Sequence, residues 1–287
     1  AVFLDDAGTT ITSVDGNIAI TGNTSGSGSF AYGIQMETGV VVRSTGTAQV
    51  ILNGTSSNGD GIATFETGTL ITSVDGNISI TGNTSGSTTS DHGIQLNSGS
   101  AVSSTGTAEV ILNGMSSNGE GIQLHGAGTL VTSLNGALSV MGTGGNYGVV
   151  VYGDADVTST GSATITLDGT VNSAAGDDAI YIEDSGTTIT SASGNISITG
   201  NTMGSGADVR GIQIGSGSVV SSTGTAQVTL NGTSSNATGG DGISIDSPST
   251  QVASLNGTIM IDGSSTNQNG VSLTDAARIK STGTAVI

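Results

Sequence analysis

A short motif, [Ile/Val]-x-Ser, recurs ten times along the chain and constrains the fold more than any other feature. Its serines stand 26 to 32 residues apart, at Ser13, Ser44, Ser73, Ser104, Ser133, Ser159, Ser191, Ser222, Ser254 and Ser281. Longer copies surround some of them, such as SVDGNIAITGNTSG at 13–26, SVDGNISITGNTSG at 73–86 and SASGNISITGNTMG at 191–204. Self-similarity at a fixed period is the signature of repeat architectures. The sequence therefore predicts a solenoid with a period of about thirty residues.

Each repeat contains three short segments in which apolar and polar residues alternate, which is typical of strands. The first is the [Ile/Val]-x-Ser segment, the second is exemplified by ISITG at 78–82, and the third follows a glycine, as in GIQL at 93–96. Three strands per repeat predict an all-β, parallel β-helix of about ten coils. Equivalent apolar residues should then stack in columns, one of them Ile18, Val50, Ile78, Val110, Leu138, Ile165, Ile196, Val228 and Ile259.

The repeats alternate between two flavours and form one continuous array over residues 1–287. Two-coil units begin near residues 8, 68, 128, 186 and 249. The segment between the second and third strands varies in length and is rich in Ser, Gly, Thr and Asn, so we expect protruding loops along one corner. Neither end carries a capping unit, and we therefore expect this array to be a slice of a longer repeat protein.

Composition excludes several classes of function. The 287 residues include 49 glycines, one proline and no cysteine, so disulfides and thiolate metal sites are excluded. The net charge of −18, with only four Lys and Arg residues, argues against a nucleic-acid partner. No apolar run is long enough to predict a transmembrane helix, so we expect no membrane insertion of this segment.

The alternating units SVDGNISITGNTSG and VSSTGTAEVILNG, joined by GIQL-type segments, resemble the haemagglutinin-like repeats of very large bacterial surface proteins. These include filamentous haemagglutinin and the passenger domains of autotransporters. The resemblance implies a right-handed β-helical shaft, extracellular or attached to the outer membrane, that mediates adhesion, aggregation or cell–cell contact. Its partner would be a receptor, a glycan or another cell surface, with lateral or end-to-end self-association as a further possibility.

One acidic pattern recurs just before the third strand of alternate coils, at Asp60, Glu120, Asp178 and Asp241. Calcium prefers six to eight oxygen ligands, often from several carboxylates, so these four residues are candidate calcium ligands. Single acids separated by a coil do not complete such a cage, and we therefore interpret them as solvated turn residues and expect no cofactor. We interpret His92 and His125 in the same way, as solvated turn or edge residues.

Other functions remain open as alternatives. A self-assembling filament or sheath would use the same repeats. A carbohydrate-active β-helix enzyme would need a cleft that gathers several acids and a cation. An ice-binding face would need a threonine row on every coil, whereas the Thr-Gly-Thr motifs occur only on some, for example at 45–47 and 105–107. Sequons such as those at Asn23, Asn53, Asn77 and Asn83 allow glycan attachment. We expect no enzymatic activity.

Overall fold

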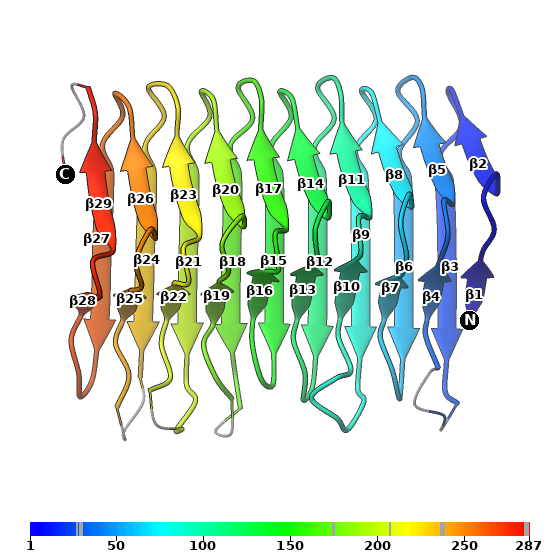
Figure 1. Ribbon diagram of the computed structural model, residues 1–287. Coiled ribbons are helices and arrows are strands. Elements are labelled where there is room, and N and C mark those ends of the chain that lie inside the picture. Colours follow the sequence, from blue (N-terminus) through cyan, green and yellow to red (C-terminus); the bar gives the residue numbers. More distant parts are fainter. Residues whose placement is uncertain (27, 29–30, 174–175, 207, 236–238, 284–286) are drawn as a thin grey trace.

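Three parallel sheets wind around one axis and form a β-solenoid of about nine turns (Figure 1). The computed structural model describes residues 1–26, 28, 31–173, 176–206, 208–235, 239–283 and 287. Among these residues all regular secondary structure is strand, and no helix is long or apolar enough to cross a membrane. The predicted all-β parallel helix with three strands per coil is confirmed.

Successive strands of the chain enter the three sheets in turn. Sheet A contains β1 (Val2–Leu4), β4 (Ile34–Met36), β7 (Ile62–Thr64), β10 (Ile94–Asn97), β13 (Ile122–His125), β16 (Val149–Tyr152), β19 (Ile180–Ile182), β22 (Ile212–Ile214), β25 (Ile243–Ile245) and β28 (Val271–Leu273). Sheet B contains β2 (Thr10–Ser13), β5 (Val41–Ser44), β8 (Leu70–Ser73), β11 (Ala101–Ser104), β14 (Leu130–Ser133), β17 (Asp156–Ser159), β20 (Thr188–Ser191), β23 (Val219–Ser222), β26 (Gln251–Ser254) and β29 (Arg278–Ser281). Sheet C contains β3 (Ile18–Thr24), β6 (Val50–Ser56), β9 (Ile78–Thr84), β12 (Val110–Ser116), β15 (Leu138–Gly144), β18 (Ile165–Val171), β21 (Ile196–Thr202), β24 (Val228–Ser234) and β27 (Ile259–Ser265).

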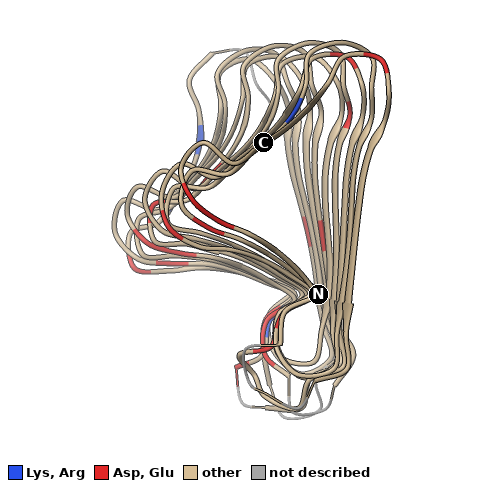
Figure 2. Ribbon diagram, turned by 90° about the vertical axis from the view of Figure 1, so that its right-hand side faces the viewer, with Lys and Arg blue, Asp and Glu red and all other residues tan. Residues whose placement is uncertain are grey.

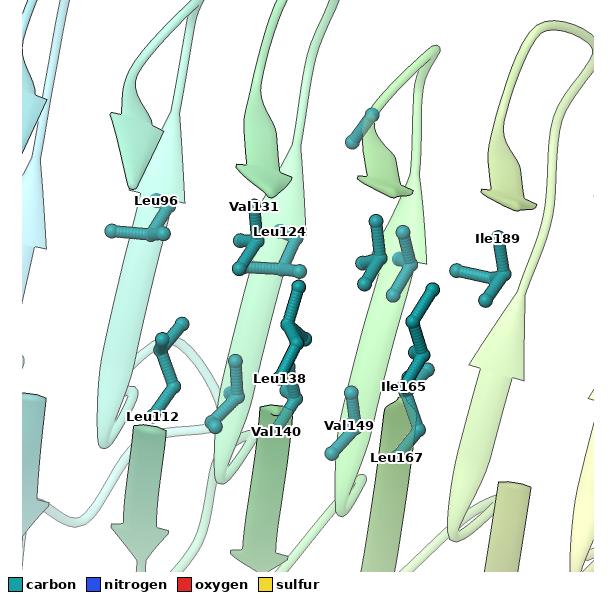
Figure 3. Packing of buried hydrophobic residues seen from close by; sticks show 14 of the residues in the cluster. Leu96, Leu112, Leu124, Val131, Leu138, Val140, Val149, Ile165, Leu167 and Ile189 are labelled. Carbon is teal, nitrogen blue, oxygen red and sulfur yellow. The ribbon is translucent and has the colours of Figure 1, made fainter. Parts of the chain in front are cut away.

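The predicted apolar column lies in sheet C and is in register along its whole length. Ile18 pairs with Val50, Val50 with Ile78, and the pairing continues to Ile259. Inward residues of sheets A and B complete a core of aliphatic side chains (Figure 3). Each interior coil therefore buries about five aliphatic residues against the coils above and below it, as the alternating pattern predicts.

The ten [Ile/Val]-x-Ser motifs form the ten strands of sheet B. The Ile or Val and the Ser have the same strand parity, and both are buried in the interior coils, as in Ile71 and Ser73. Only Ser13 and Ser281, in the outermost strands, are half-buried. Several of these hydroxyls donate to turn carbonyls; for example, Ser133 Oγ donates to the Gly136 carbonyl at 2.6 Å. The inward serine column is confirmed.

Two glycine columns face each other where sheets C and A converge. A Cβ on Gly114 of β12 would lie 2.1 Å from the carbonyl oxygen of Gly121, just before β13. The same clash would occur at Gly54 and Gly82, which occupy the equivalent positions in β6 and β9. These glycines are therefore required for close backbone approach rather than for turn geometry. The approach forms a narrow neck between the main triangular core and the loops that connect sheet C to sheet A (Figure 2).

The described parts of the loops from sheet C to sheet A lie along one corner, as predicted, while residues 27, 29–30, 174–175, 207 and 236–238 of these loops are outside the described residues (Figures 1 and 2). They are longer after β3 and β9 than after β6 and β12. Hydroxyls at the end of sheet C anchor these loops across coils. Thr84 Oγ1 donates to the Gly59 carbonyl at 2.7 Å, and Ser116 Oγ donates to the Asp91 carbonyl at 2.5 Å.

Candidate functional site

The candidate site is a groove of about 650 Å³ on the outer side of sheet A. It lies between the loop residues Thr88–Asp91 and the ends of strands β7, β10, β13 and β16. In Figure 2 the outer side of sheet A faces the angle between two sets of connections: the loops that lead from sheet C into sheet A, and the turns that lead from sheet A to sheet B. We call it the sheet A groove.

Aromatic residues, which make up only 2% of the chain, gather along sheet A. All four tyrosines are there: Tyr32 precedes β4, Tyr147 precedes β16, Tyr152 ends β16, and Tyr181 lies in β19. Phe65 directly follows β7. Outward positions of sheets B and C carry no described Phe or Tyr. In a solenoid whose repeats are otherwise similar, this concentration marks one face as different.

The acids that we interpreted as solvated belong to a column that precedes the sheet A strands. This pre-strand column consists of Tyr32, Asp60, His92, Glu120, Tyr147, Asp178, Arg210, Asp241 and Asn269. Asp60, Glu120 and Asp178 are buried, with 3%, 9% and 2% of their surface exposed, and Asp241 is half-buried. The interpretation as solvated turn residues is therefore wrong for the first three. The neighbouring coils supply partners to these acids, which is why their burial is tolerated.

His92 lies between two of these acids and is also buried, so its interpretation as a solvated turn residue is wrong. Its Nδ1 lies 2.9 Å from Asp60 Oδ1, and its Nε2 lies 2.6 Å from Glu120 Oε2. The backbone N–H of His92 also donates to Asp60 Oδ1 at 2.6 Å. Burial by itself lowers the pKa of His92, but the hydrogen bonds and negative charges of Asp60 and Glu120 outweigh this and raise it to about 9. An imidazolium between two carboxylates is therefore part of the lining of the groove.

Farther along the column, Arg210 contacts the buried carboxylate of Asp178 as His92 contacts that of Asp60. Its Nη1 lies 3.6 Å from Asp178 Oδ2, and its backbone N–H donates to Asp178 Oδ1 at 2.6 Å. Burial raises the pKa of Asp178 to about 7 although Arg210 opposes the shift. In the next pair of coils, the Asn269 backbone and side-chain N–H groups donate to Asp241 Oδ1 at 2.9 and 3.0 Å.

The four calcium candidates are therefore not brought together. Each is separated from the next by a coil that contributes His92, Tyr147 or Arg210 to the same column. Within the described part of the chain, no group of three or more His, Asp and Glu side chains could hold a metal ion. Donor groups of the neighbouring coils already use oxygens that calcium would need.

Two pairs of rings close the ends of the groove. At one end, Tyr32 and Phe65 pack with ring centroids 5.5 Å apart. At the other end, the rings of His125 and Tyr152 stack at 4.2 Å. His125 is half-buried, so its interpretation as an edge residue is close to its observed place, but the stacking was not expected from the sequence.

Uncharged amide side chains form the floor between these ring pairs. Gln95 Nε2 donates to Gln123 Oε1 at 2.9 Å, and His125 Nδ1 lies 3.1 Å from Asn97 Oδ1. These amides come from neighbouring strands in register, since Gln95 pairs with Gln123 and Asn97 with His125. The contacts between them fix the side chains in a row parallel to the solenoid axis. The floor thus offers oriented donors and acceptors rather than free charges.

A smaller hollow of about 220 Å³ continues the groove toward Tyr147 and Tyr181. It shares Glu120, Gln123 and Tyr152 with the groove. The rings of Tyr147 and Tyr181 lie 5.4 Å apart, and Tyr147 donates to Asp177 Oδ2 at 3.0 Å. The aromatic surface therefore extends across several coils.

No family model, no curated protein and no solved structure was found to match this chain. The haemagglutinin-like resemblance thus remains a prediction. The three-sheet solenoid is compatible with it but does not distinguish it from other repeat families.

Proposed function

We propose that this chain is an extracellular structural and adhesive shaft of a large bacterial surface or secreted repeat protein. It would mediate cell adhesion, aggregation or cell–cell contact. The observation that carries the proposal is the uninterrupted register of three parallel sheets over every coil. Such an array is stiff along its axis and presents its outer faces as an extended contact surface.

The distribution of charge bears on how neighbouring shafts approach one another. Acidic residues lie along the turns between sheets A and B. Others lie where the loops from sheet C enter sheet A (Figure 2). This field keeps neighbouring shafts apart and repels polyanions. A self-assembling filament or sheath is the alternative within the same structural class, and lateral contacts between purified chains in electron micrographs would favour it.

A carbohydrate-active enzyme is the second candidate, because the sheet A groove gathers Asp60, Asp91 and Glu120 with the His92 imidazolium. We favour binding over catalysis for a chemical reason. Both nitrogens of His92 face carboxylates, so the ring has no free lone pair with which to accept a proton from a substrate. Asp60 lines the groove but is almost fully buried, and one of its oxygens accepts from two donor groups of His92.

Adhesion is tested by comparing bacteria that display the full protein with an isogenic deletion strain. The displaying cells should adhere to host or bacterial surfaces, or aggregate, several-fold more than the deletion strain. The purified chain should release neither reducing ends nor unsaturated products from a panel of polysaccharides. Unchanged adhesion and aggregation in the deletion strain would contradict the proposed role, and product release would establish the enzyme instead.

A further inference from the structure

We propose that the sheet A groove is a binding site for an uncharged oligosaccharide that lies along the solenoid axis. This inference rests on the proposed function only in taking the groove as a contact surface of the shaft. It narrows the partner, which the resemblance leaves open among a receptor, a glycan and another cell surface, to one chemical class.

The groove is elongated along the solenoid axis. Phe65, Asn97, His125 and Tyr152 occupy one row at the ends of β7, β10, β13 and β16. Three strand spacings separate Phe65 from Tyr152, which corresponds to about 14 Å along the axis. The groove is therefore too long for a single sugar ring and suited to a short chain of them.

The order of chemical groups along the groove matches the two kinds of surface of a pyranose ring. A pyranose ring has apolar C–H faces, which pack on aromatic rings, and hydroxyls around its edge, which need paired donors and acceptors. The groove has a ring pair at each end and the amides of Gln95, Asn97 and Gln123 between them. Rings and a few oriented polar groups are the usual means by which a concave site selects a polar ligand with apolar faces.

The charged side chains of the groove are buried and contact other groups of the protein. The carboxylates of Asp60 and Glu120 both contact His92, whose single positive charge offsets one of their two negative charges. Asp91 is buried and accepts the backbone N–H of Thr88 at 2.9 Å. These carboxylates are buried and contact groups of the protein itself, so a cationic ligand would have to compete for them with His92 and the Thr88 N–H. An acidic glycan would meet the negative surroundings that raise the pKa of Tyr32 to about 12, where burial is the largest cause and the charges of Asp60, Glu37 and Asp91 add to it.

The loop side of the groove supplies hydroxyls. Thr88, Thr89 and Ser90 are exposed and line it. The loop is fixed in place by Ser116, whose hydroxyl donates to the Asp91 carbonyl at 2.5 Å. A groove of this kind is pre-formed, so binding would not require ordering of the loop.

The test uses the purified full chain and an immobilised panel of defined oligosaccharides. The panel contains neutral gluco-, galacto-, manno- and N-acetylglucosamine oligomers, acidic galacturonate oligomers and cationic glucosamine oligomers. We expect binding to at least one neutral series, with longer chains preferred over monosaccharides. Because the oligosaccharide carries no charge, salt should screen no attraction between it and the groove. The affinity should therefore change less than about twofold when the salt concentration is raised from about 0.05 M to about 0.5 M.

Variants locate the binding. Tyr152→Ala and Phe65→Ala should each weaken the affinity at least about tenfold, a change of about 1.4 kcal/mol. Phe3→Ala is the matched control, because Phe3 is an exposed ring of sheet A outside the groove, and this variant should bind as the wild type does. Equal circular dichroism spectra would show that all three variants are folded.

Three outcomes would overturn the inference: binding to none of the neutral series, binding only to the cationic or acidic series, or neutral binding that survives both Tyr152→Ala and Phe65→Ala. The adhesive role is judged separately, by the deletion strain. If cells that display Tyr152→Ala adhere as well as wild-type cells, adhesion uses another surface. Whether the sheet A groove binds an oligosaccharide is decided by the binding measurement alone.

Discussion

The inward column of sheet C and the pre-strand column of sheet A run through the same coils but differ in almost every respect. The first contains only Ile, Val and Leu, each stacked on a similar side chain and buried. The second changes from Tyr to Asp, His, Glu and Arg along the axis, and each residue has a different neighbour. Where the residues repeat, they hold the solenoid together; where the repetition stops, the coils become chemically distinct and a site can form.

The largest expected effect breaks the repeated column. Leu112→Ala removes a buried side chain between two coils that are fixed by their ladders and cannot collapse around the cavity. We expect a loss of about 3–5 kcal/mol in the free energy of unfolding, measured by urea denaturation. Ile111 is the matched control, because it neighbours Leu112 but points outward and is only half-buried.

Ile111→Ala should cost less than about 1 kcal/mol, since few of its contacts are lost. The contrast between the two columns depends on this difference. Equal losses for Leu112→Ala and Ile111→Ala would show that the inward column has no special role.

The next effect concerns the non-repeating column. The pKa of His92 is raised from 6.5 to about 9 in the folded chain. The bound proton therefore stabilises the fold fully below pH of about 6.5, and this stabilisation is lost as the pH rises through about 9. His92→Gln should cost on the order of 3 kcal/mol near pH 6 and much less near pH 9.5.

Urea unfolding of the wild type and His92→Gln at both pH values measures this change. His125→Gln is the control, because the partner of His125 is the Asn97 amide rather than a carboxylate. It should follow the wild-type pH dependence. A gap between wild type and His92→Gln that stays constant from pH 6 to pH 9.5 would refute the buried ion pairs.

A smaller effect is expected at the neck between sheets C and A. Gly114→Ala would place a Cβ 2.1 Å from the Gly121 carbonyl oxygen, so the two strands must separate. We expect a loss of about 1–3 kcal/mol, seen as a lower Tm. In Gly16→Ala the nearest heavy atom to the new Cβ is the Ser13 hydroxyl at 3.6 Å, and the Tm should hardly change. Similar Tm values for both variants would mean that the close approach is not needed.

The smallest effect on stability is expected in the groove. Tyr152 is half-buried and its main neighbour is the His125 ring. Tyr152→Ala should therefore lower the free energy of unfolding by less than about 1 kcal/mol while it removes oligosaccharide binding. A loss as large as that of Leu112→Ala would assign Tyr152 to the core rather than to a site.

The fold was predictable because the spacing of the [Ile/Val]-x-Ser motifs gives the length of a coil, and the alternation of apolar and polar residues gives the inward face of each strand. Ile71 and Ser73 share a parity and recur in every coil, so their inward direction followed directly. The site was not predictable in the same way. The burial of Asp60 and Glu120 depends on the neck and on loops anchored by Ser116, and the role of His92 depends on two residues about thirty positions away on either side. One signal was available: Tyr32, His92, Tyr147 and Arg210 stand at equivalent positions without resembling each other.

The central claim is that the coils are structurally equivalent but functionally unequal, and two in-register deletions test it most directly. One removes residues 78–137 and joins Asn77 to Leu138, which pairs in the same column as Ile78. The other removes residues 196–258 and joins Asn195 to Ile259 in the same way. The account predicts that both shortened chains keep the β-sheet circular dichroism spectrum and unfold cooperatively, since each coil contacts only its neighbours. Only the chain without residues 196–258 should bind the oligosaccharide that the full chain binds. Unfolding of either shortened chain, or equal binding by both, would contradict it.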